Sequence, residues 1–294
     1  MSVRPATSWP QRLARARAAK RPLVMGVLNV TPDSFSDGGR YLATEAAIVH
    51  ALAMIAAGAD IIDVGGESTR PGAAPLEADE EAARVVPVIA ALAEAAPDTL
   101  VSIDTMKVAV ARAAVEAGAG MWNDVTALGF ESHSLSAAAE LEVPVALMHM
   151  QGEPRTMQAN PTYDDVVAEV IAFLNARARA AEAAGVAPEN ILVDPGIGFG
   201  KTLKHNLALI AATGRIAKET GKPVLFGASR KRFIKAVDSR AQSADDRLGG
   251  SLAAALAAAR LGAAVVRVHD VAETAQALDV QAAIAAEEDQ GAGG

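Results

Sequence analysis

Acidic and amide side chains follow several short apolar runs of the sequence, and their chemistry suits the binding of a heterocycle. Asp104 and Asn123 follow two successive β-branched runs, and Asp194 follows a later one. Their oxygens accept hydrogen bonds, so together they would bind a ring with amino and ring N–H groups. Lys231 could contact the carbonyl or a ring nitrogen of the same ligand. Simpler interpretations remain open: Asp104 and Asn123 could cap helices, and Asp194 could start a turn.

Arg267 and His269 form a second candidate site. They are two residues apart in an apolar run, so in a strand they share one face as a cationic pair. With Arg70 and the start of a helix after Ser229, they could bind phosphate oxygens. His269 could instead be a hydrogen-bonded core histidine. His149, between two methionines, is better interpreted as structural.

The sequence offers little for a metal or a nucleotide loop. It has no cysteine and no His pair or carboxylate cluster at ligand spacing. A hard cation could still bind through Asn29 and a substrate phosphate. Residues 196–202 are glycine-rich, but their spacing fits neither a Walker A motif nor a dinucleotide fingerprint. We expect these glycines to allow the backbone to approach a flat ligand closely.

The elements that must position these residues alternate along the chain. Short β-branched runs predict eight strands, at 23–28, 61–64, 100–103, 120–122, 145–148, 191–193, 224–226 and 265–268. Stretches of helical period lie near 42–58, 77–95, 107–117, 133–141, 164–185, 204–220, 246–261 and 271–286.

Eight strand–helix units in about 250 residues predict an α/β fold, a single-domain (β/α)8 TIM barrel, in preference to an open doubly wound sheet. The polar motifs begin where the predicted strands end. In such a barrel these points form a ring on one face, where active sites are built. The sequence therefore predicts an enzyme.

Composition limits the partners. The chain has 294 residues and a formal net charge of −8, which argues against a nucleic-acid partner. The longest stretch without a charged residue, 46–59, is too short to span a bilayer. The basic start lacks an apolar segment, so we expect no secretory signal and a cytoplasmic location. We expect a loose N-terminal extension at 1–20, the barrel at 21–287 and a flexible tail at 288–294.

The motifs, taken in order, resemble those of the bacterial dihydropteroate synthase family, over roughly residues 22–282. They are NVTPDSFSDGG, DVGGESTRPGA, SIDT, WND, LMHMQGEPRTMQ, DPGIGFGK, SRK and RVHDV. The resemblance implies a (β/α)8 barrel that condenses 6-hydroxymethyl-7,8-dihydropterin diphosphate with p-aminobenzoate. The products would be 7,8-dihydropteroate and pyrophosphate. It also implies Mg2+ as cofactor, a homodimer and a sulfonamide target.

The resemblance further implies roles for individual residues. The pterin would be bound by Asp104, Asn123, Asp194 and Lys231. The diphosphate would be bound by Asn29, Thr69, Arg70, Arg267 and His269, with Asn29 also coordinating magnesium. The p-aminobenzoate site would include Phe35, Thr69, Arg70, Pro71 and Ser229. Asp37 would face the developing positive charge, and Lys231 and Arg70 would act with it in catalysis.

One position departs from the family pattern, and two other functions stay open. Some members have Ser after the lysine of the SRK motif, where this chain has Arg232, so the role of Arg232 stays open. A pterin-binding methyltransferase barrel or a non-catalytic pterin-binding relative would share the pterin pocket. The family dimerises through late helices, and the Ala-rich stretch at 251–259 would suit such packing or a buried helix equally well.

Overall fold

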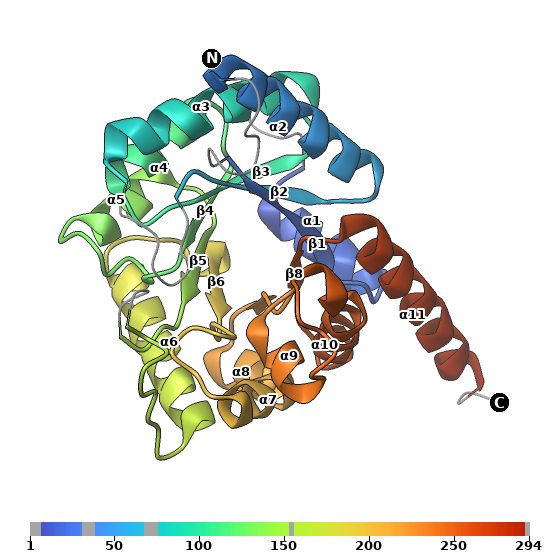
Figure 1. The fold of residues 1–294 in the computed structure, drawn as a ribbon. Helices are drawn as coiled ribbons and strands as arrows, with labels where there is room; N and C mark the ends of the chain where they lie inside the picture. The colour runs from blue at the N-terminus through green and yellow to red at the C-terminus, as the bar shows by residue number, and fades with distance from the viewer. Residues whose placement is uncertain (1–6, 31–38, 68–75, 153–155, 292–294) are drawn as a thin grey trace.

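Eight parallel strands form the centre of the protein (Figure 1). The computed structural model describes residues 7–30, 39–67, 76–152 and 156–291. The strands are β1 (Leu23–Asn29), β2 (Ile61–Gly65), β3 (Leu100–Asp104), β4 (Met121–Asp124), β5 (Val145–Met148), β6 (Ile191–Asp194), β7 (Leu225–Phe226) and β8 (Val265–Val268). Their order is β6-β5-β4-β3-β2-β1-β8-β7, and a parallel bridge from Val193 to Val224 links the two outermost strands. The predicted (β/α)8 barrel is confirmed.

Helices surround the strands, as the alternating sequence pattern predicts (Figure 1). They are α1 (Trp9–Ala18), α2 (Gly39–Ala56), α3 (Ala78–Ala95), α4 (Val108–Glu116), α5 (Ser134–Leu141), α6 (Val166–Ala183), α7 (Leu203–Ala211), α8 (Thr213–Thr220), α9 (Arg232–Val237), α10 (Leu248–Arg260) and α11 (Val271–Gly291). Short 3-10 turns occupy Pro188–Asn190 and Asp245–Arg247. Within the described ranges, no helix is both long and apolar enough to cross a membrane.

Between β6 and β8, the helices differ from the expected pattern in two places. The single helix expected at 204–220 is two helices, α7 and α8, which meet at Ala212. The hydroxyl of Thr213 donates to the carbonyl of Ile210 at this break. The six-residue α9 follows the SRK motif and was not expected, because it is too short to show a period.

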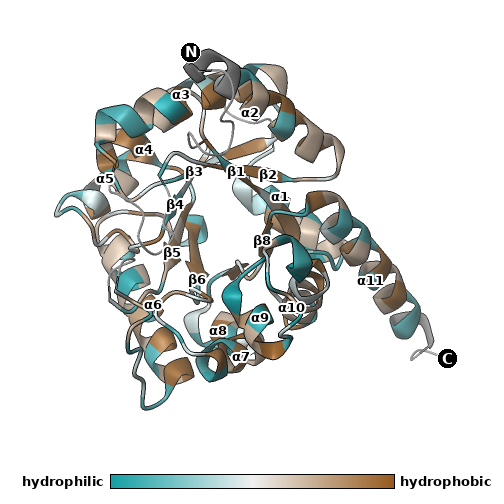
Figure 2. Ribbon diagram, in the orientation of Figure 1, coloured by the Kyte–Doolittle hydropathy of each residue, from teal (hydrophilic) through white to brown (hydrophobic). Residues whose placement is uncertain are grey.

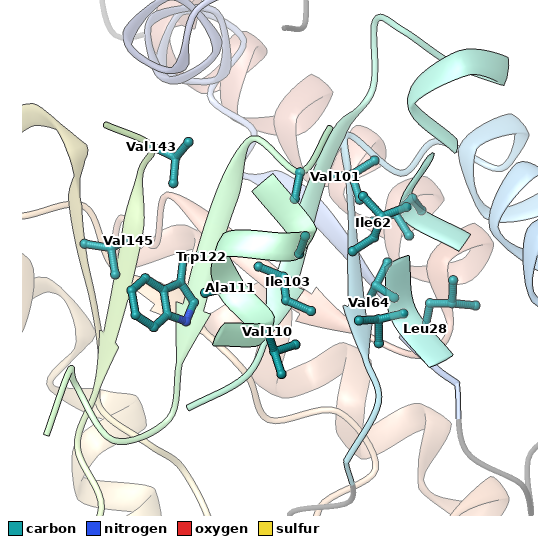
Figure 3. Close-up of a cluster of buried hydrophobic side chains, with 14 of the residues drawn as sticks. Leu28, Ile62, Val64, Val101, Ile103, Val110, Ala111, Trp122, Val143 and Val145 are labelled. Carbon is teal, nitrogen blue, oxygen red and sulfur yellow. The ribbon is translucent and has the colours of Figure 1, made fainter. Parts of the chain in front are cut away.

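The main apolar core lies between the strands and the helices. Side chains alternate across a strand, so on β2 Ile62 and Val64 point outward while Asp63 points to the barrel interior. Trp122 of β4 and Val110 of α4 belong to the same outer cluster (Figure 3). The strands are correspondingly mostly brown in Figure 2, whereas the helices also carry hydrophilic segments. Each such fully buried side chain stabilises the fold by about 1.5–3 kcal/mol.

A separate apolar layer closes the amino-terminal end of the barrel. It is formed by inward side chains near the strand starts, namely Leu23, Met25, Ile61, Leu100, Met121, Ala146, Leu192, Leu225 and Val265. Trp9 and Leu13 of α1 pack against this layer. The expectation of a loose extension at 1–20 is therefore wrong for residues 9–18. The helix was not predicted because its segment is rich in arginine, and only two apolar residues pack it against the barrel.

The chain end also differs from expectation. We expected a flexible tail from residue 288, but α11 continues to Gly291. Residues 292–294 lie outside the described ranges.

We predict that Leu13→Ala lowers the free energy of unfolding by about 2–4 kcal/mol, because it leaves a cavity at the closed end of the barrel. Leu52→Ala is the matched control, since Leu52 is 37% exposed on α2, and it should change stability by about 0.5 kcal/mol or less. Denaturant unfolding followed by circular dichroism measures both. Equal effects of the two substitutions would show that α1 is not part of the folded core.

Candidate active site

The strand ends bring four inward positions to one level. Asn29 of β1 pairs in register with Gly65 of β2, Gly65 with Asp104 of β3, and Asp104 with Asn123 of β4. A Cβ atom at Gly65 would lie 3.9 Å from Asn29 Oδ1 and 3.8 Å from Asp104 Oδ2. The glycine therefore leaves space between the amide and the carboxylate. The predicted meeting of these side chains is confirmed.

Arg267 connects this row to the barrel interior. Its Nε donates to Asp63 Oδ2 at 2.6 Å, and a terminal nitrogen donates to Asp104 Oδ2 at 2.7 Å. Asn123 Nδ2 donates to the same Asp63 oxygen at 3.0 Å. Burial lowers the pKa of Arg267, but the two carboxylates raise it by more. Asp63 was not among the predicted site residues, because within an apolar strand it is a single acidic residue whose partner is 204 positions away.

Asp194 and Lys231 meet on the opposite part of the barrel mouth. Asp194 Oδ1 accepts a hydrogen bond from the backbone of Gly196 at 2.7 Å. Lys231 Nζ donates to the carbonyl of Ile197 at 2.5 Å and lies 4.6 Å from the centre of the Phe199 ring. A Cβ atom at Gly227 would lie 3.9 Å from both Asp194 Oδ2 and Lys231 Nζ. These contacts bring the acidic and basic groups together beside a residue without a side chain.

Burial changes the charge of these groups. It raises the pKa of Asp104 to about 7, although Arg267 opposes the shift, and it also raises the pKa of Asp194. It lowers the pKa of Lys231 to about 8, while Asp194 opposes this shift. The pocket can therefore change protonation near neutral pH, which is typical of functional sites.

His269 and Ser229 lie side by side at the ends of β8 and β7. Ser229 Oγ is 3.1 Å from the His269 backbone nitrogen and 3.1 Å from its Nδ1. Burial and the nearby Arg267 lower the pKa of His269 to about 4. This shift favours the neutral imidazole, whereas the sequence predicts a cationic pair with Arg267. Val266 and Val268 pack into the outer core, as the strand pattern predicts.

Arg230 fixes the conformation of the segment that carries Ser229 and Lys231. It has a positive φ of 58°, which costs free energy for a residue with a side chain. Its guanidinium forms ion pairs with Asp270 and Asp245. These ionic contacts hold the strained turn. The sequence does not predict this role of Arg230, although its partner Asp270 directly follows the candidate residue His269.

Arg232 lies immediately beyond this segment. Its side chain is exposed and makes no ion pair or hydrogen bond with the described residues. The structure thus gives it no role.

The glycine-rich loop after β6 packs against protein rather than open space. A Cβ atom at Gly196, where φ is 66°, would lie 1.9 Å from the carbonyl oxygen of His149. One at Gly200 would lie 2.4 Å from the carbonyl oxygen of Gln151. The glycines are thus required for contact with the segment after β5, which differs from the expected role in approaching a ligand.

The same contact fixes Lys201 and His149. Lys201 is buried and its Nζ lies 3.0 Å from His149 Nδ1 and donates to the carbonyl of Phe199 at 2.9 Å. Burial lowers the pKa of His149 to about 3 and that of Lys201 to about 7. The structural interpretation of His149 fits these contacts. A buried lysine also excludes a phosphate-loop role for this motif.

A buried ion-pair cluster lies beside the row of site residues. Lys107 Nζ donates at 2.5 Å to both Glu67 Oε2 and Glu81 Oε2. Glu67 Oε1 also accepts a hydrogen bond from the backbone of Leu76 at 3.1 Å. The cluster therefore joins both ends of the segment 68–75 to α3 and to the start of α4.

Five predicted site residues lie outside the described residues: Phe35, Asp37, Thr69, Arg70 and Pro71. Their predicted roles remain predictions. Among the described residues, no group of three or more His, Cys, Asp or Glu side chains could hold a metal ion.

Comparison with known proteins identifies the relatives of the chain. The family described as pterin binding enzyme matches residues 25–269. The dihydropteroate synthase of Escherichia coli strain K12 is 49% identical over 272 residues, covering 92% of this chain and 94% of that protein. The dihydropteroate synthase of Neisseria meningitidis serogroup B is 46% identical over 268 residues, covering 90% and 93%.

Solved structures agree with the sequence matches. Yersinia pestis dihydropteroate synthase with a sulfonamide drug complex has a TM-score of 0.85 at 45% identity, covering 91% of this chain and 96% of that one. The Xanthomonas albilineans dihydropteroate synthase with 4-aminobenzoic acid has a TM-score of 0.85 at 50% identity, covering 91% and 94%. Its complex with 7,8-dihydropteroate has a TM-score of 0.82 at 48% identity, covering 91% and 95%.

We predict that Lys107→Met lowers the free energy of unfolding by about 3–5 kcal/mol, because it leaves the buried carboxylate of Glu81 and the half-buried one of Glu67 without this counterion. Lys218→Met on α8 is the matched control, since Lys218 is exposed and has no ion pair with a described residue. It should change stability by about 0.5 kcal/mol or less. Urea unfolding at pH near 7 measures both. A Lys107→Met protein as stable as the control would contradict the role of the cluster.

Proposed function

We infer the reaction from the family: the chain belongs to the dihydropteroate synthases of the pterin binding enzyme family and is a transferase. It condenses 6-hydroxymethyl-7,8-dihydropterin diphosphate with p-aminobenzoate, giving 7,8-dihydropteroate and pyrophosphate, in folate biosynthesis. The observation that carries this conclusion is the convergence of Asp104, Asn123, Asp194 and Lys231 at one barrel mouth. Family members solved with 4-aminobenzoic acid and with 7,8-dihydropteroate support it.

We propose that the pterin ring enters the barrel mouth between these four residues. Three of them offer carbonyl or carboxylate oxygens, which match the amino and N–H groups of the ring. Lys231 offers the donor that a ring carbonyl or nitrogen requires. The ring would replace water in a site that already holds its polar groups in place, which reduces the free-energy cost of ordering them on binding.

We propose that the diphosphate binds beside His269 and Ser229, with Thr69 and Arg70 as further ligands. Neutral His269 has low basicity while the site is empty, and an approaching anion would favour its protonated form. Arg267 adds a permanent charge deeper in the site. We propose that p-aminobenzoate binds beside Phe35, Pro71 and Ser229.

We propose Mg2+ as cofactor, with Asn29 as its protein ligand. Asn29 Oδ1 lies beside Gly65 at the end of β1, and this hard oxygen suits a cation that takes most of its ligands from water and phosphate. When bound, the ion would offset the negative charge of the diphosphate.

The reaction needs charge stabilisation more than proton transfer. The bond between the exocyclic carbon and the diphosphate oxygen breaks, and the electron pair leaves with the diphosphate. Arg267, His269 and Arg70 stabilise that charge, while Asp37 faces the carbon as it becomes positive. The neutral arylamine then forms the new C–N bond, and the resulting ammonium loses its proton to solvent. Holding both substrates in place supplies much of the remaining rate enhancement.

We also propose that the protein acts as a homodimer in the cytoplasm. Dimer formation through late helices is a property implied by the family. On α10, Ser251, Ala254, Ala255 and Ala258 are buried within the protomer, so they are not available for a partner. Leu207 and Leu261, which are exposed on neighbouring parts of the chain, offer apolar contacts instead. Light scattering of the purified protein measures the oligomeric state.

We predict that Asp194→Ala and Lys231→Ala each reduce dihydropteroate formation by about 100-fold or more, because each removes a polar contact to the reacting ring. Lys235→Ala is the matched control, since Lys235 is exposed on the adjacent α9, and it should keep normal turnover. The assay mixes enzyme, pterin diphosphate, p-aminobenzoate and Mg2+ and measures dihydropteroate and pyrophosphate. Chelation of Mg2+ should stop the reaction reversibly.

The same assay separates the alternatives. A wild-type protein that binds the pterin but forms neither product would overturn the proposed reaction and favour a non-catalytic pterin-binding protein. Circular dichroism of each variant checks that the fold is intact.

We predict that the affinity for the pterin diphosphate falls as pH rises through about 8. Burial lowers the pKa of Lys231 to about 8, so its ammonium is charged below that pH and neutral above it. Calorimetry from about pH 6.5 to about pH 9.5 brackets the transition. Lys231→Met should bind more weakly and lack this alkaline loss. If the variant shows the same loss, another group is responsible.

A further inference from the structure

We propose that Asp63 determines ring specificity, by fixing the orientation of the Asn123 amide. Asp63 would be a positioning residue that never touches the substrate. The proposal rests on the proposed function, because it assumes that Asn123 contacts the pterin. It concerns which pterin-like rings the site accepts, and this goes beyond the reaction itself.

The position of Asp63 suits this role. It lies in the middle of β2, points to the barrel interior and is completely buried. A ligand that enters the mouth therefore has no access to it. Its Oδ2 accepts two hydrogen bonds, from Arg267 Nε at 2.6 Å and from Asn123 Nδ2 at 3.0 Å. Its other oxygen, Oδ1, has no partner among the described residues.

The chemistry of these three groups permits only one arrangement. A guanidinium can only donate, so it needs an acceptor at 2.6 Å, which Asp63 Oδ2 provides. The same oxygen can only accept from Asn123, so the NH2 end of that amide must face it. A reversed amide would place two acceptor oxygens against each other in a buried site. The charge of Arg267 thus fixes the direction of the Asn123 amide through Asp63.

The consequence appears on the other side of Asn123. With Nδ2 engaged by Asp63, Oδ1 is the end available to a ligand, and it accepts no hydrogen bond from any described residue. Asp104 and Asp194 also present oxygens to the mouth. Three of the four groups that face the ring are therefore acceptors, and they favour a ring with a 2-amino group over a 2-oxo ring whose oxygen would face them.

Two substitutions separate this role from a general effect on the site. Asp63→Leu removes the acceptor, so the Asn123 amide is free to reverse. Asp63→Asn keeps an acceptor at this position. Arg267 Nε can only donate, so the new amide turns its oxygen toward it. The same oxygen then still accepts the hydrogen bond from Asn123 Nδ2. Both substitutions weaken the contact between position 63 and Arg267, so Asp63→Asn also controls for that change. The ratio of affinities for two rings therefore isolates the orientation of Asn123.

The test measures binding of pterin-6-carboxylic acid and lumazine-6-carboxylic acid, which carry a 2-amino and a 2-oxo ring, by calorimetry. Wild type should prefer the pterin. Asp63→Leu should reduce this preference about tenfold or more, the loss expected when one buried hydrogen bond no longer discriminates. Asp63→Asn should keep it within about threefold. A folded Asp63→Leu protein with the wild-type ratio would overturn the proposal.

A second measurement does not depend on any variant of Asp63. In wild type, the side-chain NH2 signals of Asn123, assigned by their absence in Asn123→Asp, should exchange slowly with solvent before ligand is added. They should stay protected when pterin-6-carboxylic acid binds. Fast exchange in the free protein would overturn the proposal. A failure of the proposed reaction would be recognised in the product assay, in which the wild-type protein would bind the pterin but form no dihydropteroate.

Discussion

The guanidinium of Arg267 is a full charge held within the barrel by Asp63 and Asp104, and much of the mouth is arranged around this contact. Moving an ion out of water is costly unless close partners of opposite charge compensate. Arg267 joins β8 to β2 and β3, and through Asp63 it also fixes Asn123 of β4. One buried cation thus aligns side chains from four strands before any ligand arrives.

The alternation of side chains along the strands separates stability from chemistry. Inward residues near the strand starts are apolar and are closed by Trp9 and Leu13, whereas inward residues near the strand ends are polar. Outward residues belong to the main core under the helices. The polar wall therefore rests on two apolar layers. Gly65 and Gly227 add no side chain to this wall, and a Cβ atom at either position would already be in van der Waals contact with the site residues.

The sequence predicts the barrel and the position of Asp104, Asn123 and Asp194 at its mouth, because these depend on local runs and on which end of a strand a residue follows. It does not predict the contacts between elements. In the sequence, Asp63 is a single acidic residue within an apolar strand, and its cationic partner Arg267 lies 204 residues away. The Lys107 cluster joins residues 26 and 40 positions apart. Such pairings depend on the closed barrel, which no local pattern encodes.

Because of burial, the net charge of the site without substrate differs from the sum of the charges that its residues would carry in water. Asp104 has a pKa of about 7, Lys231 of about 8 and His269 of about 4, so each lies closer to its neutral form than in water. Arg267 alone among these groups keeps its charge unconditionally. An anionic substrate favours the protonated forms of Lys231 and His269, so binding itself would increase the positive charge beside the leaving group. The site would then reach its full electrostatic strength only when the diphosphate is present to use it.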